Sequence, residues 1–419
     1  MTNSQKPENI VIVGAGPAGC ATSLFLSKAK IHHTLIDKAV FPRDKVCGDA
    51  LSGKVVYVFK QLDETLLDRF TSQPRSFLPS WGVKFAAPNG KSIDIPFKSD
   101  VSKEKHAPGF ISMRMDFDYE LFKMLDPNYA NILQGTELNL IERTSNGLNL
   151  FCKNINNNPI EFKEVKLVIG AEGDRSVVGK QLGSIVKEND HYCAGIRAYY
   201  DGVTDMHPQN FIELHFLEEL LPGYFWIFPL PDGQANVGAG MLSSSVSKKK
   251  VNLKADMLRA IKDNPNIKQR FKNATLQGKI EGWGLPLGSK QRNISGDHFL
   301  LTGDAASLID PFTGEGIGNA MYSGMLAARH IENCLSENRF DAAFNKAYDH
   351  SFYSRQWDEL KLSHTMQKLC RFPWLFNFVV NKANKNKTLR ETISCMFEDL
   401  DMRAKLRSPK FYLKLLFND

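Results

Sequence analysis

The pattern of apolar and polar positions predicts a βαβ unit at the start of the chain. The run Ile10–Val13 is apolar throughout and rich in β-branched residues, which is typical of a strand buried on both faces of a parallel sheet. A helix is expected over residues 20–30 and a second apolar strand over residues 33–36. Two strands joined through a helix predict parallel pairing in one sheet.

The middle and the end of the chain have different patterns. Several short strands are expected in the middle of the chain. These strands are expected at residues 193–200, 211–216, 224–229 and 235–241. The chain after residue 335 is expected to be mostly helical. It contains an aromatic cluster at 372–380 and a basic amphipathic stretch at 410–417, each of which could pack on the protein or lie on a membrane surface.

Three glycines follow the first strand in a spacing that is typical of dinucleotide-binding turns. Gly14 permits a tight turn, Gly16 lets a pyrophosphate approach the backbone, and Gly19 lets the helix pack closely on the strand. The free N–H groups at the helix start would face the phosphates. Asp37 follows the second strand about 20 residues later, where its carboxylate can bind a ribose diol. The expected site consists of Gly14, Gly16, Pro17, Ala18, Gly19, Asp37 and Lys38.

Length and composition indicate a large globular protein. The chain has 419 residues, of which 42% are hydrophobic and 24% charged, enough for two or three lobes. The first apolar run is followed at once by glycines, so it favours a strand over a signal peptide. No apolar stretch approaches the roughly 20 residues of a membrane-spanning helix.

Cysteine usage and net charge limit the cellular environments and the partners that are expected for the protein. Seven scattered cysteines without a CxxC pair argue against a metal site or a disulfide framework and favour a reducing, cytoplasmic environment. The net charge of +7 fits a solvated surface, or attraction to an anionic partner such as the inner face of a membrane, a pyrophosphate substrate or an acidic electron carrier. No nucleic-acid-binding motif is present, so no nucleic-acid partner is expected.

A second glycine-rich stretch lies late in the chain. A short apolar strand leads to Asp304, a carboxylate suited to the ribityl or ribose hydroxyls of an extended FAD. A loop then opens a helix expected over residues 319–330, whose first N–H groups can face the O2 edge of a flavin. The residues expected to bind the cofactor here are Asp304, Pro311, Gly314, Gly316 and Ile317.

The early GxGxxG turn, paired with the late Gly-Asp and PxxGxG stretches, resembles the flavoprotein fold typified by p-hydroxybenzoate hydroxylase. Two weaker motifs resemble the same fold. Residues 167–176 contain Gly173 but have Glu172 where Asp is usual, and Lys180 lies where an Arg is common. Arg114, at the start of a predicted helix, matches an arginine that lies on the flavin side of such proteins, although an exposed helix arginine is the plainer interpretation.

This resemblance implies an α/β fold in which a Rossmann-like FAD-binding domain is interleaved with an antiparallel-sheet substrate domain and followed by a C-terminal helical region. FAD is the implied cofactor. The implied FAD-binding segments are 1–74, 113–186 and 291–335, the substrate-domain segments are 75–112 and 187–290, and the helical region is 336–419.

Two further stretches are similar to the geranylgeranyl reductase family. Residues 41–52 contain its PRxKxCG pattern, and residues 223–229 contain its YxWxFP pattern. The resemblance covers residues 9–335, with five motifs in the same order. It implies that the turn Cys47, Gly48 and Asp49 folds over the flavin, with Arg43 and Lys45 supplying positive charge nearby.

Each stretch also has a plainer interpretation. The turn could be a tight surface turn with a packed thiol, and only Cys47 is a candidate for a redox or substrate-positioning role. Tyr224, Trp226 and Phe228 alternate at period two, so they share one face of a strand. That face is either hydrophobic core or the aromatic wall of a pocket for a lipid-like substrate.

The implied activity is reduction of carbon–carbon double bonds in an isoprenoid chain, with the chemistry carried mainly by the cofactor. The electron donor would be NAD(P)H or a ferredoxin-like carrier protein, and the partner a hydrophobic prenyl or lipid-like substrate. Three alternatives stay open: an aromatic monooxygenase, a flavin halogenase, and a non-catalytic prenyl-binding protein.

Overall fold

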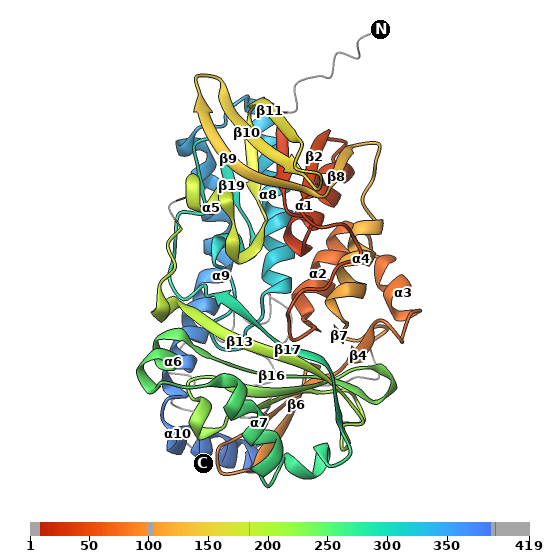
Figure 1. Cartoon of the computed structure of the whole chain (residues 1–419), viewed down its shortest axis with the longest axis vertical. Coiled ribbons are helices and arrows are strands. Elements are labelled where there is room, and N and C mark those ends of the chain that lie inside the picture. Colours follow the sequence, from red (N-terminus) through yellow and green to blue (C-terminus); the bar gives the residue numbers. More distant parts are fainter. Residues whose placement is uncertain (1–8, 99–103, 184, 387–389, 391–419) are drawn as a thin grey trace.

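The computed structural model describes residues 9–98, 104–183, 185–386 and 390, and its core is a mostly parallel six-stranded sheet (Figure 1). The strand order is β18-β19-β12-β1-β2-β8, and only β18 runs antiparallel to its neighbour. These strands are β1 (Ile10–Val13), β2 (His33–Asp37), β8 (Ala130–Gln134), β12 (Leu167–Gly170), β18 (Ser295–Gly296) and β19 (Phe299–Leu301). The predicted βαβ unit is confirmed, because β1 and β2 pair in parallel.

Helices pack on this sheet and on one another. The predicted first helix starts earlier than expected, at Pro17 instead of residue 20, because proline suits the first helical position after Gly16. The late helix runs from Ile317 to Glu337, so the predicted range 319–330 was too short. The helices of this part are α1 (Pro17–Lys28), α2 (Gly53–Leu62), α3 (Leu66–Thr71), α4 (Arg114–Lys123), α5 (Val177–Gln181) and α8 (Ile317–Glu337).

Two small antiparallel sheets extend this part. One, in the order β11-β10-β9, lies at the top of Figure 1, and the other, in the order β3-β7-β4, adjoins α2. Their strands are β9 (Thr136–Thr144), β10 (Gly147–Asn154), β11 (Pro159–Val165), β3 (Ala50–Leu51), β7 (Gly109–Ile111) and β4 (Leu78–Ser80).

The second large sheet has seven strands in the order β17-β13-β16-β15-β14-β5-β6. All neighbours are antiparallel except β14 and β5. The four predicted middle strands are confirmed to within one residue at each end. The seven strands are β5 (Gly82–Ala86), β6 (Ser92–Pro96), β13 (Tyr192–Asp201), β14 (Ile212–His215), β15 (Tyr224–Pro229), β16 (Gln234–Leu242) and β17 (Thr275–Pro286).

Helices cover both faces of the seven-stranded sheet. On one face, α6 (Ser243–Lys249) and α7 (Leu253–Asp263) pack on the sheet, and Met257 is fully buried against its apolar residues. On the other face, the long helix α9 (Ala342–Leu369) leads into α10 (Pro373–Lys385), which contacts β6. The expected helical character after residue 335 is confirmed through Lys385, whereas the stretch 410–417 lies outside the described residues.

The aromatic cluster at 372–380 forms the first half of α10, and one side of this helix is packed on the protein. Phe376, Val380 and Ala383 join the hydrophobic core beside the seven-stranded sheet. No helix in the described part of the chain is both long enough and apolar enough to cross a membrane.

A buried ion pair ties β14 to the 3₁₀ turn Lys268–Phe271. Arg270 donates to both carboxylate oxygens of Glu213, at 2.5 and 3.0 Å, and both side chains are buried. Burial alone would raise the pKa of Glu213, but hydrogen bonds from His215 and Arg270 outweigh it and lower the pKa to about 2.

We expect Arg270→Leu to lower the free energy of unfolding by about 3–5 kcal/mol, because it leaves the Glu213 carboxylate buried without its main partner. Chemical denaturation at neutral pH measures the loss. The double variant Glu213→Leu/Arg270→Leu, which removes both charges, should regain most of it. A loss below about 1 kcal/mol in the single variant would contradict this account.

Candidate functional site

The glycine turn after β1 is too tight for side chains at two of its three glycines. Gly14 has φ +101°, and a Cβ there would lie 2.5 Å from the carbonyl oxygen of Ala171. A Cβ on Gly19 would lie 1.7 Å from the carbonyl oxygen of Gly14, so α1 can pack against the turn only without a side chain at this position. The roles predicted for these two glycines are therefore structural.

Gly16 is different, because space lies beside it. It is the N-cap of α1, its φ of −74° is open to any residue, and no side chain caps the helix. The nearest heavy atom to a Cβ there is Nη2 of Arg43, at 3.6 Å. Arg43 is held by Asp118 at 2.8 Å. Uncapped N–H groups facing a guanidinium form a cradle that fits a pyrophosphate.

The acid at the end of β2 lies beside this cradle. Asp37 accepts hydrogen bonds from the backbone N–H groups of Ala15 and Ala39, both at 2.7 Å. Each carboxylate oxygen keeps a further acceptor position, so the group can still bind ribose hydroxyls. Lys38 follows as an exposed residue. Pro17 and Ala18 form the buried first turn of α1.

Asp304 lies in a 3₁₀ turn, Gly303–Ala306, directly after β19. Its carboxylate accepts no hydrogen bond from the described residues. Burial raises the pKa of Asp304, while the positive charges of Lys45 and Arg114 act in the opposite direction. Burial, and then repulsion from Arg114, lower the pKa of Lys45 to about 8. A carboxylate with free acceptor positions between cations suits the hydroxyls of a ribityl chain.

The middle motif has a local structural role. Glu172 accepts hydrogen bonds from the backbone N–H groups of Val177 and Val178, at 2.9 and 3.1 Å, and from the Ser176 hydroxyl at 2.6 Å. Glu172 therefore accepts hydrogen bonds from the first N–H groups of α5. Its side chain, one methylene longer than that of the usual Asp, can reach them. Gly173 has φ +77° with open space around it, and Lys180 is exposed.

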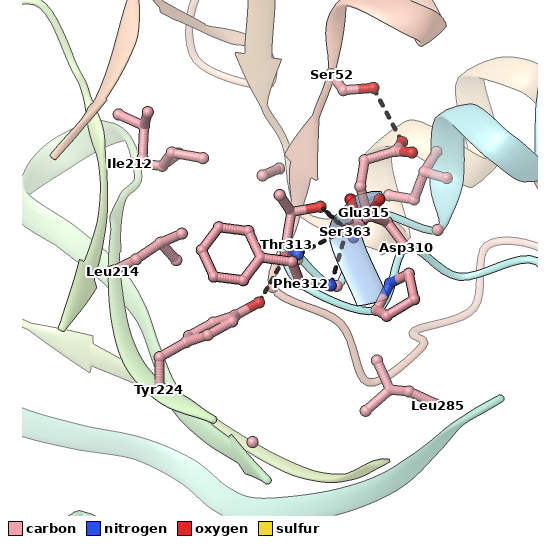
Figure 2. A pocket seen from close by; sticks show the side chains of 18 of the residues that line it. Ser52, Ile212, Leu214, Tyr224, Leu285, Asp310, Phe312, Thr313, Glu315 and Ser363 are labelled. Carbon is pink, nitrogen blue, oxygen red and sulfur yellow. Dashed lines mark hydrogen bonds between the residues drawn. The ribbon is translucent and has the colours of Figure 1, made fainter. Parts of the chain in front are cut away.

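A cavity of about 600 Å³ separates the late glycine loop from the seven-stranded sheet (Figure 2). Tyr224, Trp226 and Phe228 of β15 all line it, as their period-two spacing allows. The loop residues Pro311, Gly314, Gly316 and Ile317 line it as well. The Tyr224 hydroxyl donates to the backbone oxygen of Thr313, so one wall is tied to the other.

The cavity is mainly apolar and has a polar side. Its apolar lining includes Val83, Phe97, Phe110, Ile212, Leu214, Leu285, Leu287, Phe312 and Leu362. Figure 2 shows Ile212, Leu214, Phe312 and Leu285 around the space, with Ser52, Asp310 and Glu315 at one side. The cavity is also lined by exposed residues of α9, namely Arg355, Asp358, Lys361 and Thr365. We call the part of the cavity beside these four residues the α9 opening.

The turn at residues 47–49 packs against the cavity wall. Asn236 of β16 donates to the Cys47 backbone oxygen at 2.8 Å and to the Asp49 carboxylate at 2.7 Å. It also accepts from Nε1 of Trp226 at 2.8 Å. The Tyr199 hydroxyl donates to Asp49 at 2.8 Å. A surface turn is therefore the wrong interpretation for Asp49, which is fully buried, while Cys47 is half-buried with its thiol near Arg114.

Asp49 is a buried acid in this wall with an unusual backbone and an incomplete set of hydrogen bonds. Its φ is +67°, and its Oδ1 is buried without a hydrogen-bond partner. Burial raises the pKa of Asp49 to about 7, although hydrogen bonds from Asn236 and Tyr199 act against the rise. The carboxyl is therefore partly protonated at neutral pH.

We expect Asp49→Asn to alter how stability depends on pH. Because its folded pKa is raised, the wild-type carboxyl contributes stability that is full below its unfolded pKa of about 4 and is lost as pH rises through 7. The unfolding free energy of the variant minus that of the wild type should therefore rise by up to about 4 kcal/mol between pH 4 and pH 8. Denaturation at several pH values measures it, and a constant difference would refute the raised pKa.

The residues around Glu315 form a second polar cluster. Glu315 accepts from the backbone N–H of Gly318 at 2.6 Å and from the Ser52 hydroxyl at 2.9 Å, and its Oε2 is buried without a partner. Lys54 is buried beside it and donates to Asn319, Gln356 and Glu359. This cluster joins the turn after β3 to α8 and α9.

Sequence reasoning missed Asn236, Tyr199, Glu315 and Lys54. A signal existed for Asn236, because it is the only polar residue between 235 and 241 and shares its strand face with Gly238 and Gly240. Tyr199 and Lys54 carried no such signal, since their partners lie 150 and more than 260 positions away in sequence.

Comparisons with known proteins agree with this geometry. The model of a family described as FAD binding domain matches residues 8–357. A menaquinone reductase of Mycobacterium tuberculosis is 28% identical over 334 residues, covering 78% of this chain and 76% of that protein. A digeranylgeranylglycerophospholipid reductase of Methanococcus vannielii is 28% identical over 370 residues, covering 86% and 87%.

The fold has a similar solved structure. A geranylgeranyl bacteriochlorophyll reductase-like protein of Thermoplasma acidophilum superposes with a TM-score of 0.77 at 22% identity, covering 89% of this chain and 90% of that chain. The predicted fold class and the resemblance to the geranylgeranyl reductase family are confirmed.

Proposed function

Since this chain belongs to the FAD binding domain family, we propose that it is an FAD-dependent reductase of carbon–carbon double bonds in isoprenoid chains. One observation carries the proposal: the mainly apolar cavity of about 600 Å³ lies between the aromatic residues of β15 and the glycine loop before α8. Its size is within the range of ligand-binding pockets. The names of the two reductase relatives support an isoprenoid-containing substrate.

The proposal assigns FAD to the residues of the two glycine stretches. Gly16, the start of α1 and Arg43 would hold the pyrophosphate, Asp37 the ribose and Asp304 the ribityl hydroxyls. The N–H groups at the start of α8 would face the flavin ring. When bound and reduced, FAD supplies the hydride for the substrate double bond. The electrons would come from NAD(P)H or a ferredoxin-like carrier.

The chain's own residues would position the substrate and keep water out. Tyr224, Trp226 and Phe228 offer an apolar surface on which an isoprenoid chain can lie. Saturation of a double bond also requires a proton at the neighbouring carbon. Asp49 lies in the cavity lining, and burial raises its pKa to about 7, so its carboxyl group can hold that proton at neutral pH. Burial also raises the pKa of Glu315, a second carboxyl group of the lining.

Product mass tests the proposal. Dithionite-reduced protein is incubated without oxygen with geranylgeranyl diphosphate, and in a second reaction with a menaquinone. We expect products heavier by two hydrogens for each bond reduced. Unchanged prenyl substrates, together with oxygen insertion into an aromatic compound in air, would instead indicate a monooxygenase. A purified protein without FAD that still binds prenyl compounds would indicate a non-catalytic binding protein.

A further inference from the structure

The outer face of α10 carries large apolar side chains that the described protein leaves exposed. Trp374 is 68% exposed and Phe378 40% exposed, and they lie one helical turn apart on one side. Phe372, at the N-cap, is 52% exposed, and Leu369, at the end of α9, is 45% exposed. The opposite side of α10, with Phe376, Val380 and Ala383, packs on the core. The exposed residues are therefore not needed to hold the helix in place.

The end of α9 and α10 form a basic stretch of the chain. Residues 360–390 contain no Asp or Glu but seven basic residues: Lys361, Lys368, Arg371, Lys382, Lys385, Lys387 and Arg390. Lys368, Arg371 and Lys385 are exposed and form no ion pair with the described residues. Exposed aromatic side chains surrounded by unneutralised cations are the combination that binds the surface of an anionic bilayer.

This face is near the α9 opening of the cavity. Lys361 and Thr365 of α9 line the opening, and α9 continues from them for one more turn before α10 begins. At 1.5 Å per residue, Thr365 and Leu369 are separated by roughly 6 Å along α9, and Phe372 follows three residues after the helix ends. If a bilayer contacts α10, an isoprenoid chain that leaves this bilayer would thus reach the α9 opening within a short distance.

We propose that the outer face of α10 and the end of α9 form a docking surface for an anionic phospholipid bilayer. Trp374, Phe378 and Phe372 enter the interfacial layer, and Lys368, Arg371 and Lys385 contact lipid phosphates. The α9 opening then lies beside the bilayer, where a prenylated lipid can enter the cavity. The role of the opening rests on the proposed function, whereas the docking does not.

Vesicle binding tests this without turnover, so its failure is separate from failure of the reductase proposal. The full-length holoprotein is sedimented with vesicles of phosphatidylcholine alone or with 30% phosphatidylglycerol. We expect binding to the anionic vesicles, weakened about tenfold or more by Trp374→Ser/Phe378→Ser and by Lys368→Glu/Arg371→Glu. The matched controls Met115→Ser/Leu140→Ser and Lys60→Glu/Lys153→Glu change exposed residues elsewhere and should bind like the wild type.

Trp374 also provides a direct spectroscopic readout. Brominated lipids should quench part of the tryptophan fluorescence of the wild type, and the Trp374→Phe variant should lose this quenching while it still binds. Equal binding by wild type and both α10 variants overturns the proposal. The proposal is also overturned if only the variant Lys410→Glu/Lys414→Glu loses vesicle binding, because the binding would then belong to residues near 410–414. Self-association that depends on Trp374 and Phe378, without vesicle binding, overturns it in favour of a second copy.

Discussion

Gly16→Val is expected to yield a folded protein that purifies without FAD. The backbone of Gly16 accepts any residue, and a Cβ there meets nothing closer than Nη2 of Arg43 at 3.6 Å. The valine methyl groups would therefore occupy the space proposed for the pyrophosphate. An overlap costing about 1–3 kcal/mol lowers affinity roughly 5- to 150-fold. Visible flavin absorbance per protein measures the loss, and circular dichroism checks the fold.

Gly14→Val is the contrasting variant. With φ +101° and a Cβ position 2.5 Å from the Ala171 oxygen, it should lose stability as well as flavin. If Gly16→Val keeps a full complement of FAD, the pyrophosphate does not lie beside Gly16 and the assigned cofactor site is wrong.

Gly240→Leu should strongly slow turnover of long isoprenoid substrates while leaving FAD in place. Gly240 lines the cavity on β16, opposite Tyr224, and a Cβ there would make only ordinary contacts, at 3.7 Å to Ala194 and 3.8 Å to Trp226. The longer side chain would take space from the substrate. We expect kcat/KM for a geranylgeranyl substrate to fall by about 100-fold or more, equivalent to about 3 kcal/mol.

A smaller substitution at Gly240 and one at the nearby Gly238 provide controls. Gly240→Ala adds one carbon and should reduce kcat/KM far less. Gly238→Ala places its Cβ 2.2 Å from the Trp226 ring and from the Ile196 backbone oxygen, so it should destabilise the sheet itself. Unchanged kinetics in Gly240→Leu, with FAD bound, would show that the substrate lies elsewhere.

The parts of this molecule that could be predicted are those whose signals lie close together in sequence. The strand Ile10–Val13, its glycines and Asp37 lie within 28 residues, so spacing alone indicated the βαβ unit. The strand Tyr224–Pro229 was found at its observed bounds, because its aromatic residues alternate at period two. The predicted start of α1 at residue 20 is too late, because Pro17 is already the first helical residue and not the last part of the turn.

The polar contacts across the cavity wall could not be predicted. Asn236 joins Cys47 and Asp49 across 189 and 187 positions, and these contacts require the seven-stranded sheet to lie against the turn at residues 47–49. Period two placed Tyr224, Trp226 and Phe228 on one face but could not say whether that face was core or cavity. That distinction depends on the loop containing Phe312, which comes from a different part of the chain.

The central claim is that the acceptor of electrons is a double bond in the isoprenoid chain. A quinone ring can itself reoxidise a flavin, so the most direct measurement compares two substrates with the same diphosphate head group, one with a geranylgeranyl chain and one with the fully saturated chain. Photoreduced protein is mixed with each without oxygen, and flavin absorbance is followed. We expect rapid reoxidation of the flavin by the unsaturated compound alone. Reoxidation by neither compound, or equally by both, would contradict it.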